Sequence, residues 1–130
     1  MSHTLSHYSK TQLDALALLF EAGVRIWDTG GGSTVVKILL SLYNGTRFQV
    51  DLTDLRRLDE RLLDAAMTVI RMDAARTYAE IHVVIAGLYG VETRCIGSVF
   101  EHWAYDLGMK GRCKKDQLPS RYRVELMGAF

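Results

Sequence analysis

Apolar residues recur at steps of three and four along most of the chain, and this spacing is the strongest constraint on its fold. The pattern is clearest between residues 52 and 75. Its apolar members are Leu52, Leu55, Leu58, Leu62, Ala66, Met67 and Ile70. Steps of three and four place side chains on one face of an α-helix, whereas a half-buried strand needs strict alternation. The series predicts a helical region over 52–75, in which Asp59 restarts the helix after a kink.

The same spacing predicts three more helices, which cover residues 12–27, 34–43 and 91–107. Helix 34–43 is apolar on nearly every side, and Lys37 is its one charged residue. A helix without a polar face is normally buried on all sides. We therefore expect helix 34–43 at the centre of the core, with the other helices packed around it.

Capping residues mark the ends of the first two predicted helices. Thr11 with Asp14 three residues later resembles a capping box, which predicts that the first helix begins near Thr11. The segment 28–32, with successive glycines at 30–32, is expected to break the helix, because glycine loses the most backbone freedom in a regular element. Ser33 or Thr34 is then expected to cap the second helix.

Two short stretches leave helix and strand open. Residues 80–86 are rich in β-branched side chains but also fit helical spacing, and we favour helix because a lone strand would lack a partner. Residues 46–50 alternate weakly, so a short extended arm is the alternative there. With 48 % hydrophobic and 24 % charged residues, the composition is that of a globular domain. The sequence predicts a single all-α domain over 1–130, built as a compact bundle of four to six helices.

Charge is unevenly distributed along the chain. Residues 109–130 hold six basic and two acidic residues, whereas residues 1–108 hold 10 basic and 13 acidic ones, so a net +4 and a net −3 give the overall +1. The six basic residues are Lys110, Arg112, Lys114, Lys115, Arg121 and Arg123. A basic C-terminal segment of this kind contacts a nucleic-acid backbone, contacts an acidic protein surface, or only keeps the chain in solution. We take these six residues as the candidate partner- or nucleic-acid-binding site.

No pattern of residues supports catalysis, a metal or a cofactor. The triplet Asp28-Thr29-Gly30 occurs in aspartic proteases, but those need it in a β-rich fold, and its flanks here are helical. Cys95 and His102 lie seven residues apart on one predicted helix, and two ligands are too few for a zinc site. A Cys95–His102 dyad remains the one enzymatic alternative. We therefore predict a protein that is not an enzyme and that binds neither metal nor cofactor.

The cellular location is expected to be the cytoplasm. The two cysteines, Cys95 and Cys113, are too few for a disulfide framework, which favours a reducing compartment. No apolar run has the length of a membrane span, and residues 1–10 lack the order of a secretory signal.

Residues 28–75 resemble a family of small uncharacterised proteins from integrative conjugative elements and plasmids of proteobacteria. The resemblance rests on the Asp28-Thr29-Gly30 turn, an apolar helix ending in Tyr43-Asn44, and the segment VDLTDL at 50–55. Val50 stands where the family has Phe, and residues 40–43 lack its pair of tryptophans. No part of the resemblance extends beyond Arg76. It implies a protein carried by a bacterial mobile element, and it transfers no catalytic residue.

These observations lead to two hypotheses about function. The first is a non-catalytic protein-binding module of a mobile element, an inhibitor of a host defence complex of the anti-CRISPR type. Its partner would be a host or mobile-element protein complex, and a homodimer is left open. The alternative is a small nucleic-acid-binding regulator that uses the basic segment 110–123, although no predicted helix is strongly basic.

Overall fold

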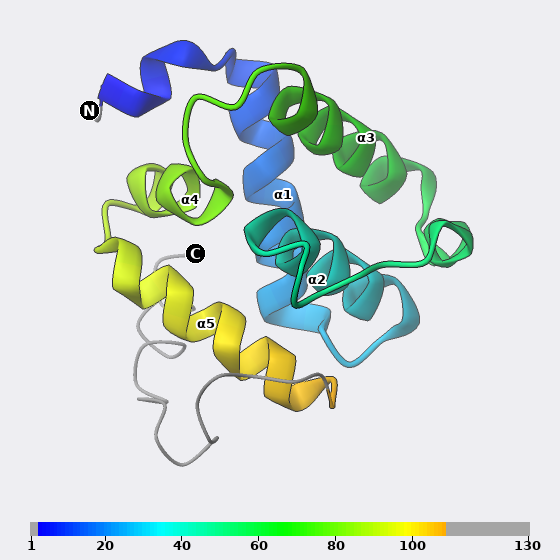
Figure 1. The fold of residues 1–130 in the computed structure, drawn as a ribbon. Helices are drawn as coiled ribbons and strands as arrows, with labels where there is room; N and C mark the ends of the chain where they lie inside the picture. The colour runs from blue at the N-terminus through cyan, green and yellow to red at the C-terminus, as the bar shows by residue number, and fades with distance from the viewer. Residues whose placement is uncertain (1–2, 109–130) are drawn as a thin grey trace.

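The computed structural model describes residues 3–108, which form five α-helices and two short 3₁₀-helices (Figure 1). In chain order these are η1 (His3–His7), α1 (Lys10–Ile26), α2 (Gly30–Tyr43), η2 (Leu52–Arg57), α3 (Glu60–Ala75), α4 (Ile81–Tyr89) and α5 (Thr93–Asp106). No strand occurs within residues 3–108. The predicted all-α bundle of four to six helices is confirmed.

Helix α2 lies at the centre of the bundle, as its all-round apolar sequence predicts. It contacts each of the other four α-helices and also η2. Its fully buried apolar residues are Val35, Val36, Ile38, Leu39 and Leu40. Helix α1 packs against α2 and α3, while α4 and α5 pack against each other and α4 also contacts both α1 and α2 (Figure 1). Helices α1 and α3 lie side by side, with α3 on the outer side of α1 (Figure 1).

Aromatic side chains fill the part of the core between α1 and α5. The Trp103 ring lies 5.6 Å from the Phe20 ring and 5.4 Å from the Phe100 ring, and all three side chains are fully buried. Gly23 allows this packing, because a Cβ at that position would lie 2.9 Å from the Trp103 indole. The close approach of α1 to Trp103 therefore depends on glycine.

The corner between α1 and α2 is tighter than the sequence predicts. The cap of α2 is Thr29, whose Oγ1 accepts a hydrogen bond from the Gly32 backbone N–H at 3.0 Å. The prediction of Ser33 or Thr34 as cap is wrong, because the three glycines form the first helical turn instead of a break. A Cβ on Gly32 would lie 1.7 Å from the Ile26 carbonyl oxygen, so the chain reverses where only glycine fits.

Helix α1 begins at Lys10, next to the predicted start near Thr11, but its cap is Ser9 and not Thr11. The Ser9 hydroxyl accepts a hydrogen bond from the Gln12 backbone N–H at 3.1 Å, and the Gln12 side-chain oxygen Oε1 accepts one from the Ser9 backbone N–H at 2.9 Å. This reciprocal pair is a complete capping box. The Asp14 carboxylate, which we expected to take part in the cap with Thr11, pairs with Lys10 at 2.9 Å.

The remaining predictions of secondary structure are mostly confirmed. Residues 81–89 form α4, so helix is the right reading of 80–86. The kink at Asp59 is confirmed, because its side chain caps α3 by accepting a hydrogen bond from the Leu62 N–H at 2.8 Å. Helix 91–107 begins and ends within two residues of its predicted bounds. No extended arm forms at 46–50, where a turn at 45–47 is followed by irregular backbone that buries the Phe48 side chain.

Within residues 3–108, no single helix has the length and hydropathy to cross a membrane. The α4–α5 pair meets both criteria only when joined, and it is bent by 117° at the junction.

Candidate functional site

The basic residues predicted as the binding site are outside the part of the chain that the structure describes. Lys110, Arg112, Lys114, Lys115, Arg121 and Arg123 all belong to segment 109–130. Their role as a partner- or nucleic-acid-binding site stays a prediction.

The Cys95–His102 pair does not have the geometry of a catalytic dyad. Both residues are on α5, where seven residues correspond to a rise of about 10 Å along the helix axis. A nucleophile and its base need to lie within hydrogen-bond distance of each other, about 3 Å. Within residues 3–108, no group of three or more His, Cys, Asp or Glu side chains is placed to hold a metal ion.

A groove between α1 and α3 is the candidate functional site that the described residues favour. Its volume is about 230 Å³. Four apolar residues line it, namely Leu18, Ala22, Ile26 and Leu62. Four charged residues also line it, namely Glu21, Arg25, Asp59 and Arg61. The groove follows α1 from its middle to its C-terminal end and crosses to the first turns of α3.

The apolar part of the groove comes from one side of each helix. Leu18, Ala22 and Ile26 follow each other at steps of four on α1, so they lie on one line along the helix. Leu62 of α3 is buried and faces this line. Leu18 and Ala22 are partly buried against the core, and Ile26, at the end of the row, is 39 % exposed. The groove therefore presents accessible apolar surface between two fixed helices.

Two acidic and two basic side chains border this apolar surface. Glu21 is held by α4, because its carboxylate accepts a hydrogen bond from the Tyr89 hydroxyl at 3.4 Å. Burial and the nearby Glu21 charge both raise the pKa of Tyr89, so the phenol stays protonated and keeps its role as donor. Asp59 is fixed by its role as the cap of α3. Arg61 forms no ion pair with any described residue.

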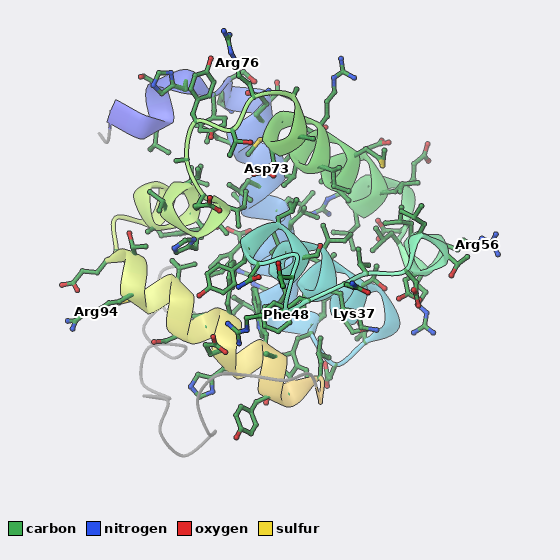
Figure 2. The ribbon with its side chains drawn as sticks, viewed as in Figure 1. Lys37, Phe48, Arg56, Asp73, Arg76 and Arg94 are labelled. Atoms are coloured by element: carbon green, nitrogen blue, oxygen red, sulfur yellow. The ribbon has the colours of Figure 1, made fainter. Side chains whose placement is uncertain are left out.

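The segment VDLTDL, which carries the family resemblance, anchors η2 on the N-terminal end of α2. The Asp54 carboxylate lies 3.8 Å from the Lys37 ammonium and 4.0 Å from the Arg57 guanidinium. Thr34 Oγ1 lies 3.4 Å from the Asp54 carbonyl oxygen. Figure 2 shows Lys37 at this junction and Arg56 projecting from η2 at the edge of the molecule. Leu52 of the motif is 79 % exposed, so its side chain takes no part in this anchoring.

A buried ion pair connects the segment after α2 to α5. Both guanidinium nitrogens of Arg47 donate to the Glu101 carboxylate, at 2.8 and 2.9 Å. The two side chains are only 15 % and 11 % exposed. Because 54 residues separate them in sequence, no local pattern could have predicted this contact. It fixes the Phe48 backbone region against α5 and lies outside the groove.

The chain belongs to DUF7673, a family of unknown function whose sequence profile matches residues 13–103. The expected membership in an uncharacterised family is therefore confirmed, and the match extends well beyond Arg76, where the resemblance ended. No curated protein and no solved structure matches the chain. The match covers α1 almost completely and all of α2, η2, α3 and α4, so every helix that forms the groove is part of the family's common sequence.

Proposed function

We propose that this protein is a non-catalytic protein-binding module and that the α1–α3 groove receives part of its partner. The observation that carries this proposal is an apolar row of Leu18, Ala22 and Ile26 that stays accessible within a border of four charged side chains. Protein interfaces have this anatomy, with an apolar centre that excludes water and a polar rim that remains solvated.

The partner element best matched to the groove is one amphipathic helix. Helices bind in grooves between two other helices through apolar residues at steps of three and four. The rim carries two acidic residues, Glu21 and Asp59, and two basic residues, Arg25 and Arg61. The bound helix would therefore need both basic and acidic residues beside its apolar row. Opposite charges at such a rim mainly select the partner and its orientation.

The role of this binding would be to inhibit a host defence complex, as an anti-CRISPR-type protein of a bacterial mobile element does. This finer assignment is supported by the resemblance of the DTG turn and the VDLTDL segment to proteins of proteobacterial mobile elements. A small protein without a catalytic cluster in its described part can inhibit a larger complex by occupying a surface that the complex needs.

A second candidate function is nucleic-acid binding by the segment 110–123. It is supported by the net charge of +4 over residues 109–130, against −3 for the rest of the chain. Nucleic-acid binding of this kind weakens steeply with salt, because each basic residue that pairs with a phosphate releases a counterion. Lys114→Glu combined with Lys115→Glu would then weaken binding to all sequences about equally.

Affinity capture from a bacterial lysate, with and without nuclease, tests the first function against the second. The tagged protein is compared with Ile26→Glu, which places a charge in the groove. Met67→Glu is the matched control, because Met67 is 51 % exposed and belongs to α3 but does not line the groove. Circular dichroism establishes that both variants keep their helical content.

The proposal predicts a stoichiometric protein that remains after nuclease, is retained by Met67→Glu and is lost with Ile26→Glu. The identity of that protein also tests the proposed inhibition of a defence complex. Material that disappears with nuclease would instead support the nucleic-acid function. A protein retained equally by both variants would show that the groove is not the binding surface.

A further inference from the structure

A second cleft lies at the opposite end of α3, where the chain enters α1. Its volume is about 310 Å³, at the lower end of the range of small-molecule sites, which is roughly 300–1,000 Å³. Residues from the start of the chain, from the last turns of α3 and from the loop before α4 line it. It shares no residue with the α1–α3 groove, so the two sites can be tested separately.

Stacked aromatic rings form one wall of this cleft. The His7 and Tyr78 rings are parallel within 11°, with their centroids 4.1 Å apart. The Tyr8 ring meets Tyr78 edge-on at 5.8 Å. Tyr78 is nevertheless 42 % exposed, so the stack is built at the surface and not in the core. A planar ligand that adds to this stack would gain contact area without any rearrangement of the helices.

Two arginines contribute positive charge to the same cleft. Arg71 and Arg76 both line it, and neither forms an ion pair with any residue between 3 and 108. The Arg76 guanidinium lies 5.6 Å from the centre of the Tyr78 ring, and Figure 2 shows Arg76 projecting outward at this end of the molecule. An arginine on an aromatic face is held in place while its N–H groups stay available for an anion.

The acidic group nearest in sequence does not neutralise these arginines. Asp73 is half-buried and does not line the cleft. Burial, with a smaller contribution from Glu80, raises the pKa of the Asp73 carboxyl. A carboxylate paired with an arginine would show the opposite shift. The positive charge of Arg71 and Arg76 is therefore available to a ligand.

Two neutral polar side chains complete the lining. Gln12 and Thr68 both face the cleft, one from α1 and one from α3. The Gln12 Oε1 accepts from the Ser9 N–H at 2.9 Å and the Thr68 hydroxyl donates to the Asp64 carbonyl oxygen at 3.0 Å. Gln12 keeps its amide N–H groups as donors toward the cleft, and Thr68 keeps its hydroxyl oxygen as an acceptor. The apolar side chains of Met72 and Ala75 supply the rest of the surface.

We propose that this cleft binds a nucleotide unit, whose base stacks on the His7–Tyr78 wall and whose phosphate pairs with Arg71 and Arg76. Proteins hold a base and a phosphate together by placing stacked aromatic rings beside arginines, and within residues 3–108 neither Arg71 nor Arg76 has a carboxylate partner. The Gln12 amide N–H groups and the Thr68 hydroxyl oxygen are placed to form hydrogen bonds with the sugar or the base. The nucleotide would be either a free nucleoside monophosphate or one unit of a single strand.

Isothermal titration calorimetry with AMP, adenosine and inorganic phosphate tests the proposal on the full chain. We expect AMP to bind more tightly than adenosine or phosphate alone, because only AMP engages the aromatic wall and both arginines. Arg71→Gln and Arg76→Gln should each weaken AMP binding roughly tenfold or more, as expected for the loss of a charged hydrogen bond. Tyr78→Leu should weaken AMP binding and leave phosphate binding unchanged.

Arg56→Gln is the matched control, since Arg56 is an exposed arginine on η2, far from the cleft (Figure 2). It should bind AMP like the unmodified protein. A single-stranded hexa-deoxyadenylate serves as a second probe. If AMP binds, the ligand is a free nucleotide. If only the oligonucleotide binds, and this binding is lost in Arg71→Gln and Arg76→Gln, the ligand is a unit of a single strand. The proposal is overturned if neither probe binds, if phosphate binds as tightly as AMP, or if Arg56→Gln weakens binding as much as Arg76→Gln.

Discussion

Substitution of Gly32 by alanine should destabilise the protein, although alanine normally favours a helix. The added Cβ would lie 1.7 Å from the Ile26 carbonyl oxygen and 2.9 Å from the Thr29 hydroxyl. Non-bonded contacts of Cβ atoms are essentially never shorter than 3.0 Å. The corner between α1 and α2 must therefore open by more than 1 Å, and the hydrogen bond from Gly32 to the Thr29 cap must lengthen or break.

The magnitude follows from three contributions. Forcing an extra methyl group into a packed site costs about 1–3 kcal/mol. Loss of the Thr29 cap costs about 1 kcal/mol more. The higher helix propensity of alanine returns about 1 kcal/mol. We expect the free energy of unfolding of Gly32→Ala to fall by about 2 kcal/mol.

Gly30→Ala is the matched control, because Gly30 belongs to the same helical turn. A Cβ there would meet only the Arg57 side chain, at 3.8 Å, which is an ordinary contact. Urea unfolding followed by circular dichroism should show Gly30→Ala unchanged or stabilised by up to about 1 kcal/mol. If Gly32→Ala proves as stable as Gly30→Ala, the tight corner is not what the glycine is needed for.

Three further predictions concern other parts of the fold. Gly23→Ala should lower the free energy of unfolding by about 1–3 kcal/mol, because its Cβ would meet the buried Trp103 indole at 2.9 Å. Gly97→Ala should leave the free energy of unfolding unchanged, because its nearest neighbour lies at 3.9 Å. Equal urea midpoints for the two variants would contradict this. Glu101→Leu should lower the free energy of unfolding by about 3 kcal/mol, because it leaves the Arg47 guanidinium buried without its carboxylate. Adding Arg47→Met should recover part of that loss. A double-mutant cycle that shows no coupling between the two positions would refute a stabilising role for the pair. Burial lowers the pKa of His82, so the unfolded chain binds more protons than the folded one below about pH 6.5. The His82 contribution to the free energy of unfolding should therefore be complete well above pH 6.5 and be lost as the pH falls through and below about 6.5. The decrease should be smaller in His82→Gln, and an identical decrease in that variant would exclude His82 as the cause.

The sequence predicts the helices well because each one carries its own apolar period. The buried row of α2 and the interrupted series from 52 to 75 are local patterns, and both correspond to observed elements. Phe48 is different, because its burial depends on the contact of its segment with α5, which local alternation cannot reveal. The sequence also predicts the wrong cap for α2, for a similar reason. Glycine is unfavourable inside a helix, but the tight corner between α1 and α2 has room only for glycine at position 32, and this requirement outweighs that cost.

Neither candidate site could be predicted from the sequence alone. The α1–α3 groove combines Ile26 with Arg61, and the second cleft combines His7 with Arg76, so each needs the packing of distant segments. Read along the chain, the charged residues of α3 resemble an ordinary solvated face. The local signal is the apolar row Leu18, Ala22 and Ile26, which runs at steps of four beside the buried residues of α1.

Hydrogen exchange of the protein alone and with its captured partner tests the central claim most directly. If the groove is the binding surface, added protection should be concentrated in peptides covering residues 18–26 and 59–62, because these hold its lining. The loop 76–80 at the other cleft should exchange as in the free protein. Protection absent from 18–26 and 59–62 and found only elsewhere, such as in segment 109–130, would contradict the assignment of the groove as the site of partner binding.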